Sequence, residues 1–342
     1  MRCPVPTTCG VWACFRDCAG FYRWLRQGGT PVLRVPLSGG TILVNARVRH
    51  LDYIEELSIV LAHRWDPERI FVIFTANFDE SNTHGQKPTV ILAAYVGHAY
   101  QWLRFNKKLA RLQTAYGFKV FHATDFKGRR REFSGWSDEK CAALISDLTE
   151  LVRDNLALGM TIALDYNRFM NEYRAPPIPS KMHMDSQYGA CFRACMGHLI
   201  DFLALRQHRD KLNIVIERGH PNVRDCERIF DDLKKRFHNI DVDILGSFTI
   251  ERKDTWPPLL VADLLAHTYS MVRAHNAAGT LPAGALQPAK TLKGALAFLE
   301  LAPNALAELK SGYIRFRQLE IDEWRARKAA KKASSLVGRQ PS

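Results

Sequence analysis

Acidic side chains stand at the ends of predicted strands, where an α/β sheet usually carries its chemistry. Asp79 and Glu80 directly follow the apolar run IFVIFTANF, and Glu217 ends the run LNIVIE. Side chains at the carboxyl ends of strands converge on one edge of such a sheet. Carboxylates that meet there repel one another, and a divalent cation removes that repulsion. Oxygen-only ligands favour Mg²⁺ or Mn²⁺ over Zn²⁺, so these two ions are the expected cofactors.

A fourth acidic residue interrupts an apolar helical stretch. Asp263 lies within LLVADLLAH, and a charged side chain is costly to bury there unless it meets a cation or another partner. We therefore expect Asp79, Glu217 and Asp263 to be metal ligands, with Glu80 in the same site. Two ions held about 3.5–4 Å apart by such ligands can activate water and stabilise the leaving oxygen in phosphodiester cleavage.

Simpler interpretations of the same acids remain open. An Asp-Glu pair after a strand often forms a turn or caps a helix, and Glu217 before Arg218 could form a surface ion pair. Asp263 is harder to explain in this way, because its neighbours on both sides are typical of a protein core.

Several basic side chains could serve the same chemistry. His122 could protonate a leaving group or orient a phosphate, although a hydrogen-bonded histidine at a strand end is an equal alternative. The loop that follows contains guanidinium groups suited to phosphate, and Lys253 precedes the segment of Asp263; a solvated loop and an ordinary lysine are the alternatives. The predicted nucleic-acid-binding residues are Arg129, Arg130, Arg131 and Lys253.

The elements that must position these residues alternate along the chain. Apolar runs separated by the turn-forming residues 81–88 predict an opening hairpin, and helices with an apolar stripe alternate with strands after it. The predicted strands span residues 70–78, 89–97, 118–126, 160–166, 212–217 and 242–250. The predicted helices span residues 101–117, 185–205, 222–237 and 258–275, and a further helix begins at Ser137 with a buried stripe that extends to Val152.

Composition bounds the remaining possibilities. The chain has 342 residues, a formal net charge of +13 and no apolar run long enough to span a membrane. We expect a cytoplasmic protein with no membrane association, and the excess of positive charge favours an anionic partner, nucleic acid first. Eight cysteines in a chain this long do not indicate a disulfide scaffold. We expect an N-terminal extension at residues 1–68, an α/β domain at 69–276, and a helical basic tail at 277–342.

Three short motifs resemble one known family. FDES after the first strand, FHATDF, and LLVADLLAH, in this order between Ile70 and Asn276, resemble the domain-of-unknown-function 3800 family. That family is placed with ribonuclease H-like proteins and is marked by a D-E pair and a later Q-x-x-A-D. By position, Asp79 and Glu80 match the pair and Asp263 matches the final Asp. His122 matches a frequent His, and Glu217 stands where a ribonuclease H-like site has an acid. The Gln of the second motif is Leu259 here.

The resemblance implies a ribonuclease H-like mixed α/β sheet with an opening hairpin and flanking helices. It also implies a metal-dependent nuclease or phosphoryl-transfer activity, although Leu259 leaves it uncertain whether the chain is an active enzyme. The alternatives are a non-catalytic nucleic-acid-binding protein of a mobile-element or defence system, and an enzyme of small phosphorylated metabolites.

Overall fold

Six strands form one mixed sheet. In the computed structural model the order is β5-β4-β1-β2-β3-β6. The pairs β1–β2 and β2–β3 are antiparallel, whereas β1–β4, β4–β5 and β3–β6 are parallel. The strands are β1 (Ile73–Ser81), β2 (Thr89–His98), β3 (Leu158–Asp165), β4 (Lys211–Glu217), β5 (Leu245–Glu251) and β6 (Ala295–Glu300).

The structure describes residues 73–81, 89–179, 182–205, 211–238, 244–280, 295–301 and 303–337. The chain divides by its contacts into two units, Met1–Asp52 and Tyr53–Ser342, and all described residues belong to the second unit. The predicted extension at residues 1–68 therefore lies outside the described residues.

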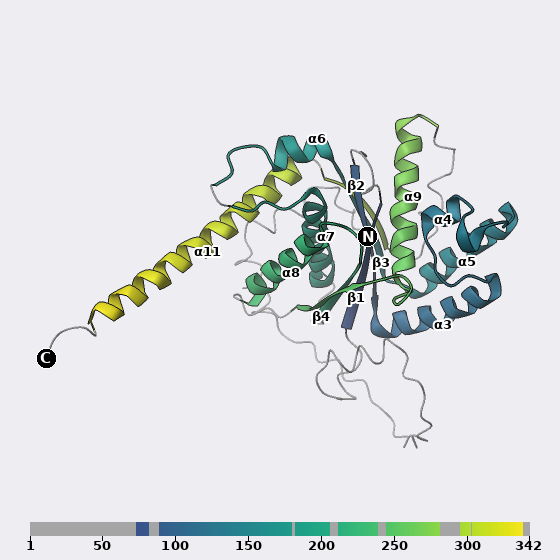
Figure 1. Ribbon diagram of the computed structural model, residues 1–342, viewed down its shortest axis with the longest axis horizontal. Coiled ribbons are helices and arrows are strands. Elements are labelled where there is room, and N and C mark those ends of the chain that lie inside the picture. Colours follow the sequence, from purple (N-terminus) through teal and green to yellow (C-terminus); the bar gives the residue numbers. More distant parts are fainter. Residues whose placement is uncertain are drawn as a thin grey trace, which may run out of the picture. The chain divides into compact units, whose positions relative to one another are not determined.

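Helices cover both faces of the sheet (Figure 1), so the predicted mixed α/β sheet with an opening hairpin and flanking helices is confirmed. On one face α9 crosses β1 and β2, with α3 and α5 packed beyond it, and α7 and α8 cover the opposite face. None of the described helices is long and apolar enough to cross a membrane. The main helices are α3 (Ala99–Tyr116), α4 (Ala123–Lys127), α5 (Asp138–Asn155), α7 (Gln187–Leu205), α8 (Val223–His238), α9 (Leu259–Ala277) and α11 (Pro303–Val337).

Local sequence explains these elements. The central strands β2 and β3 are buried along nearly their whole length, which is why they are apolar throughout rather than alternating. Helix α5 begins after Ser137, whose hydroxyl accepts a hydrogen bond from the Lys140 backbone N–H at 3.2 Å. Helix α3 ends at Gly117, which adopts the left-handed conformation with φ of 77° that glycine tolerates best.

Residues 118–126 do not form the predicted strand. The chain runs irregularly to His122 and then enters α4. The backbone N–H groups of Lys119 and Val120 donate to the carboxylate of Glu132, so they pair with a side chain instead of a neighbouring strand. The aromatic residues that resembled a strand pattern form a packed cluster, with Phe121 and Phe133 rings 5.7 Å apart.

The sheet and the helical layers continue beyond residue 276. Strand β6 pairs with β3, and α11 packs through its first half on the layer that contains α7. Tyr313 of α11 is buried, donates a hydrogen bond to the His183 backbone oxygen at 2.6 Å, and lies beneath the Arg193 guanidinium at 4.5 Å. This packing ties the start of the long helix to the domain.

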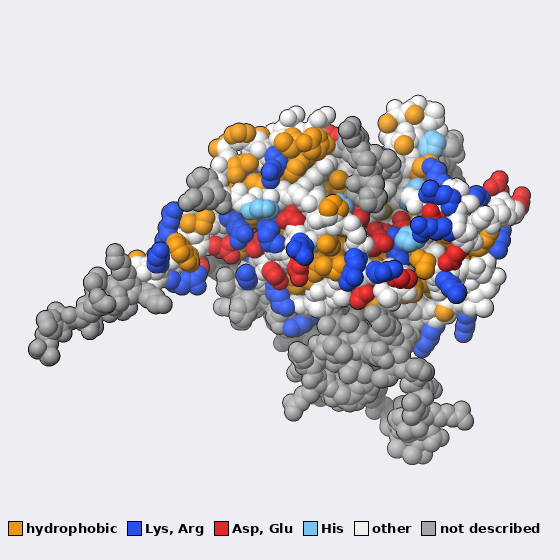
Figure 2. All heavy atoms as spheres, in the orientation of Figure 1, with side chains coloured by type: hydrophobic (Ala, Val, Ile, Leu, Met, Phe, Trp, Pro, Cys, Tyr) orange, Lys and Arg blue, Asp and Glu red, His pale blue; other side chains and the backbone are white. Residues whose placement is uncertain are grey.

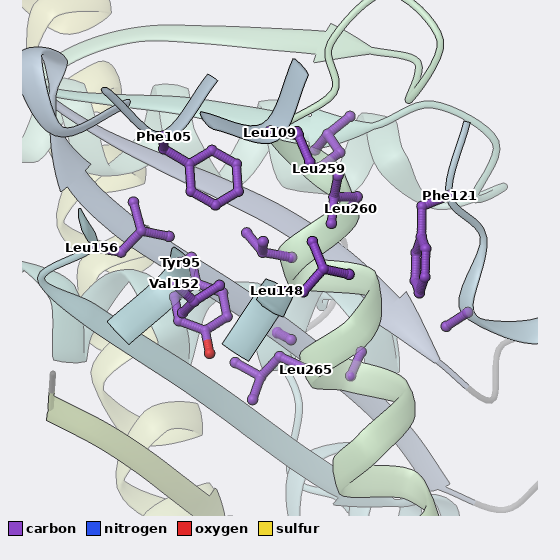
Figure 3. Close-up of a cluster of buried hydrophobic side chains, with 14 of the residues drawn as sticks. Tyr95, Phe105, Leu109, Phe121, Leu148, Val152, Leu156, Leu259, Leu260 and Leu265 are labelled. Atoms are coloured by element: carbon purple, nitrogen blue, oxygen red, sulfur yellow. The ribbon is translucent and has the colours of Figure 1, made fainter. Parts of the chain in front are cut away.

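The main apolar core lies between the sheet and the helices α3, α5 and α9 (Figure 3). Leu259 belongs to this core and is fully buried with Leu109, Leu148 and Leu260. The residue at the Gln position of the Q-x-x-A-D motif therefore packs in the core here.

Replacing Leu259 with Gln should destabilise the fold, because an amide would enter a fully buried apolar position. We expect Leu259→Gln to lower the free energy of unfolding by about 2–4 kcal/mol. Urea unfolding followed by circular dichroism measures this. Leu319→Gln, at a position 58% exposed on α11, is the matched control and should change the free energy of unfolding by less than about 0.5 kcal/mol. Equal stability of the two variants would contradict the placement of Leu259 in the core.

Candidate functional site

Two of the predicted acids lie side by side because of strand register. In the parallel pair β1–β4, Phe78 is opposite Ile216, so the next residue on each strand is Asp79 and Glu217. Both strands point the same way, and both acids therefore lie at the same edge of the sheet. Asp79 is 1% exposed, because β1 is a central strand with neighbours on both sides.

Helix α9 brings the third acid to the same place. Its first turns pack across β1 and β2, and Asp263 projects toward the ends of these strands. The Asp263 Oδ2 atom accepts a hydrogen bond from the backbone N–H of Ala123 at 2.9 Å, at the point where α4 begins. The helix thus presents its one interior acid to the sheet edge while its apolar neighbours fill the core.

The side chain of Lys253 lies at the centre of these acids. Its Nζ atom is 2.8 Å from Asp79 Oδ2, 2.7 Å from Glu217 Oε2 and 3.0 Å from Asp263 Oδ2. Three carboxylates from two strands and a helix therefore meet around one ammonium group. The Lys253 side chain is 6% exposed, whereas Glu217, at 17%, is the most exposed of the four.

The electrostatics of this cluster are dominated by burial and by its mutual charges. Burial alone would lower the pKa of Lys253, but the negative charges of Asp79, Asp263 and Glu217 outweigh it and raise that pKa. Burial raises the pKa of Asp79 well above its usual range, and Lys253 opposes only part of this effect. Burial and the charge of Asp79 also raise the pKa of Asp263. Burial therefore favours the protonated forms of Asp79 and Asp263, and the ammonium of Lys253 favours their charged forms.

Glu80 lies beside this cluster but outside the contacts of Lys253. Its Oε2 atom accepts a hydrogen bond from the Tyr188 hydroxyl at 3.3 Å, and its own backbone N–H donates to Asp79 Oδ1 at 2.8 Å. Burial, followed by the charge of Asp79, raises the pKa of Glu80 to about 8. Tyr188 comes from α7, and its ring stacks on His220 at 3.8 Å. The two consecutive acids are thus supported from opposite faces of the sheet.

Tyr188 and Trp256 are supporting residues that the sequence did not single out. The Trp256 Nε1–H donates to Asn77 Oδ1 at 2.6 Å and fixes the segment that carries Lys253 against β1. Both aromatic residues stand in stretches that are typical of a core. The sequence offered one signal for these two residues: the Tyr hydroxyl and the Trp ring N–H must each form a hydrogen bond when the side chain is buried.

The predicted basic residues divide into separate environments. His122 immediately precedes α4 and is half-buried; burial and the charge of Lys253 lower its pKa, while Asp263 opposes them. Arg130 and Arg131 reach Asp125 at 3.4 Å each, and their side chains are 63% and 74% exposed. Arg129 instead pairs with Asp138 at the start of α5, at 2.6 Å. Figure 2 shows Lys and Arg side chains interspersed with acidic ones on the viewed face.

The donor chemistry of this cluster fits a hard divalent cation. The nearby groups are carboxylates, and Asp79 Oδ2 is buried and accepts no well-oriented hydrogen bond from the described residues. As the side chains stand, the described residues hold no group of His, Cys, Asp or Glu arranged to bind a metal ion. The point that the three carboxylates share is filled by Lys253, so a cation fits this donor set only where the ammonium has moved aside.

Comparisons with known proteins are sparse. No model of a protein family matches the chain, and no curated protein matches it. A solved structure described as Bst-RNase HIII in complex with Mn²⁺ aligns with 14% sequence identity and a TM-score of 0.35. The alignment covers 71% of this chain and 66% of that one, so this chain spans just under two thirds of that protein.

The raised pKa of Glu80 predicts a pH dependence of stability. The folded protein keeps the Glu80 proton up to a pH of about 8, whereas the unfolded chain loses it near 4.5. Folding therefore takes up a proton between these values, and this contribution is full below the lower pKa and is lost as the pH rises through the upper one. We expect the stability of the wild type relative to Glu80→Gln to fall between about pH 5 and 8, by at most about 1.4 kcal/mol per pH unit.

Urea unfolding of both proteins in buffer with a chelator measures this difference at each pH. Parallel stability profiles for the wild type and Glu80→Gln would contradict a protonated Glu80 in the folded protein.

Proposed function

We propose that the chain is a divalent-metal-dependent phosphodiester hydrolase that acts on nucleic acid. The observation that carries this proposal is the convergence of Asp79, Glu217 and Asp263 within 3.0 Å of one atom, Lys253 Nζ. Carboxylates from separate elements rarely gather in a buried place without a cationic partner, because their burial and mutual repulsion are costly. The motifs that resemble the domain-of-unknown-function 3800 family point in the same direction.

Each residue has a defined part in this proposal. Asp79, Glu217 and Asp263 hold the cation, and Tyr188 holds Glu80 at the edge of the same site. A bound Mg²⁺ or Mn²⁺ supplies Lewis-acid activation of water and of the phosphate. Glu80 and His122 both interact electrostatically with the carboxylates. The pKa of Glu80 is raised and that of His122 is lowered, and both shifts favour the neutral side chain. Near neutral pH, protonated Glu80 is therefore a candidate to deliver a proton and neutral His122 a candidate to accept one.

The basic residues near α4 suit a polyanionic substrate. Arg130 and Arg131 are exposed and lie on the side of α4 and His122, where their guanidinium groups are available to phosphates. Their carboxylate partner Asp125 is shared, so the pair keeps net positive charge. Phosphates that approach this side would pass from exposed arginines toward the acids, whereas Arg129 is held by Asp138.

Removing a single carboxylate tests the proposed hydrolase. Asp79→Asn and Asp263→Asn should each reduce cleavage of RNA, DNA or their hybrid in Mn²⁺ or Mg²⁺ by at least about 100-fold, because each variant loses a charged ligand. Gel assays with labelled strands measure the rate. Asp254→Asn is the matched control, because Asp254 pairs with Arg252 at the surface at 2.7 Å and should leave the rate unchanged. Cleavage at the same level by the wild type and both site variants would refute the proposal.

A non-catalytic nucleic-acid-binding protein is the second candidate. The observation that favours it is the position of Lys253, whose ammonium contacts all three carboxylates and fills the point that a metal ion would need. This candidate predicts nucleic-acid binding that is sensitive to salt, with no binding of Mn²⁺ and no cleavage.

The arginines beside α4 give a prediction that both candidates share. We expect the double variant Arg130→Gln/Arg131→Gln to bind nucleic acid more weakly. We also expect the slope of log affinity against log salt to become shallower by about one for each lost phosphate contact. Fluorescence anisotropy at several salt concentrations measures both quantities. Arg153→Gln, which removes an arginine paired with Asp154 on α5, is the control. An unchanged salt slope in the double variant would exclude these arginines from the interface.

A further inference from the structure

Lys253 occupies the position that a divalent cation would need. Its Nζ atom lies 2.7–3.0 Å from three carboxylate oxygens. Mg²⁺ binds oxygen at about 2.0–2.1 Å, so a cation at the same point needs the carboxylates to move inward by less than about 1 Å. The ammonium group and the cation cannot both occupy this point.

The charge of the cluster favours the ion of higher charge. Three carboxylates from two strands and a helix surround one ammonium. A divalent cation would compensate more of this charge than the single charge of the lysine does.

The backbone around Lys253 is anchored, whereas its side chain has a flexible stem. On one side the Arg218 backbone N–H donates to the Glu251 carbonyl at 2.6 Å, and on the other side Trp256 donates to Asn77 at 2.6 Å. The aliphatic stem of a lysine can rotate and carry the ammonium away without moving these anchors. Glu217, the most exposed of the carboxylates, marks the side on which solvent reaches the cluster.

We propose that Lys253 is an internal counter-ion that competes with the divalent cation for the carboxylates, so that cation binding and release of the lysine are one coupled event. This inference rests on the proposed metal-dependent function. Without the cation, Lys253 holds the three acids together; with the cation bound, its ammonium points toward solvent.

The variant Lys253→Met tests this competition, because it removes the charge and keeps a side chain of similar length. We expect Lys253→Met to bind Mn²⁺ at least tenfold more tightly than the wild type, measured by the electron paramagnetic resonance signal of free Mn²⁺. We expect Lys253→Arg, which keeps the charge, to bind Mn²⁺ as weakly as the wild type. Lys234→Met, which removes an ammonium that donates to the Gly246 carbonyl oxygen, is the control and should not change the affinity.

The outcomes separate this inference from the proposed function. Equal Mn²⁺ affinity, or weaker affinity in Lys253→Met, would overturn the competition and leave the metal-dependent function standing. No Mn²⁺ binding by either protein would overturn both.

A second measurement uses the wild type and does not depend on the folding of a variant. Amine acylation followed by mass spectrometry should modify Lys253 slowly without metal, because its ammonium is buried among carboxylates. Saturating Mn²⁺ should increase the modification of Lys253 at least fivefold and leave that of the exposed Lys107 unchanged. Equal protection of Lys253 with and without bound Mn²⁺ would overturn the inference.

Discussion

The contact of the Lys253 ammonium with Asp79, Glu217 and Asp263 is the interaction on which the site and much of the fold depend. These four residues come from β1, β4, α9 and the segment between β5 and α9. The cluster therefore joins elements that lie far apart in the sequence. Removing the Lys253 ammonium would leave buried carboxylates facing one another, and breaking a buried ion pair in this way is strongly destabilising. The ammonium of Lys253 therefore keeps the three acids together in the fold.

Neutral hydrogen bonds support this charged centre from both faces of the sheet. On the α9 side Trp256 pairs with Asn77, and on the α7 side Tyr188 pairs with Glu80. Both aromatic side chains are almost fully buried, so each donor is held in a fixed direction by packing. These contacts fix the segment of Lys253 against β1 and hold the Glu80 side chain on the α7 side.

The sequence predicted the acids of the site better than their central partner. Asp79 and Glu217 could be predicted from the sequence because strand ends can be recognised from apolar runs. Asp263 could be predicted because a charged side chain among core residues needs a partner. The central position of Lys253 was not predictable, since it depends on where the chain after β5 returns to the sheet. The strand predicted at residues 118–126 is wrong because clustered aromatic residues imitate a strand. Leu259 fills the core, which sequence alone could not distinguish from a lost site residue.

The formal charge of +13 acts differently at the centre and at the surface. Lys253 forms ion pairs with the buried carboxylates, and Arg129 forms one with Asp138. In this structure neither side chain is therefore available to bind a polyanion. A phosphodiester that approaches the acids meets like charge, which exposed Arg130 and Arg131 offset only at a distance. A cation between the acids and the phosphate would remove that repulsion. Under the proposed function, the acidic centre that repels a phosphate in the lysine-bound form would bind it once a cation is present, so the occupant of this one position would control phosphate binding.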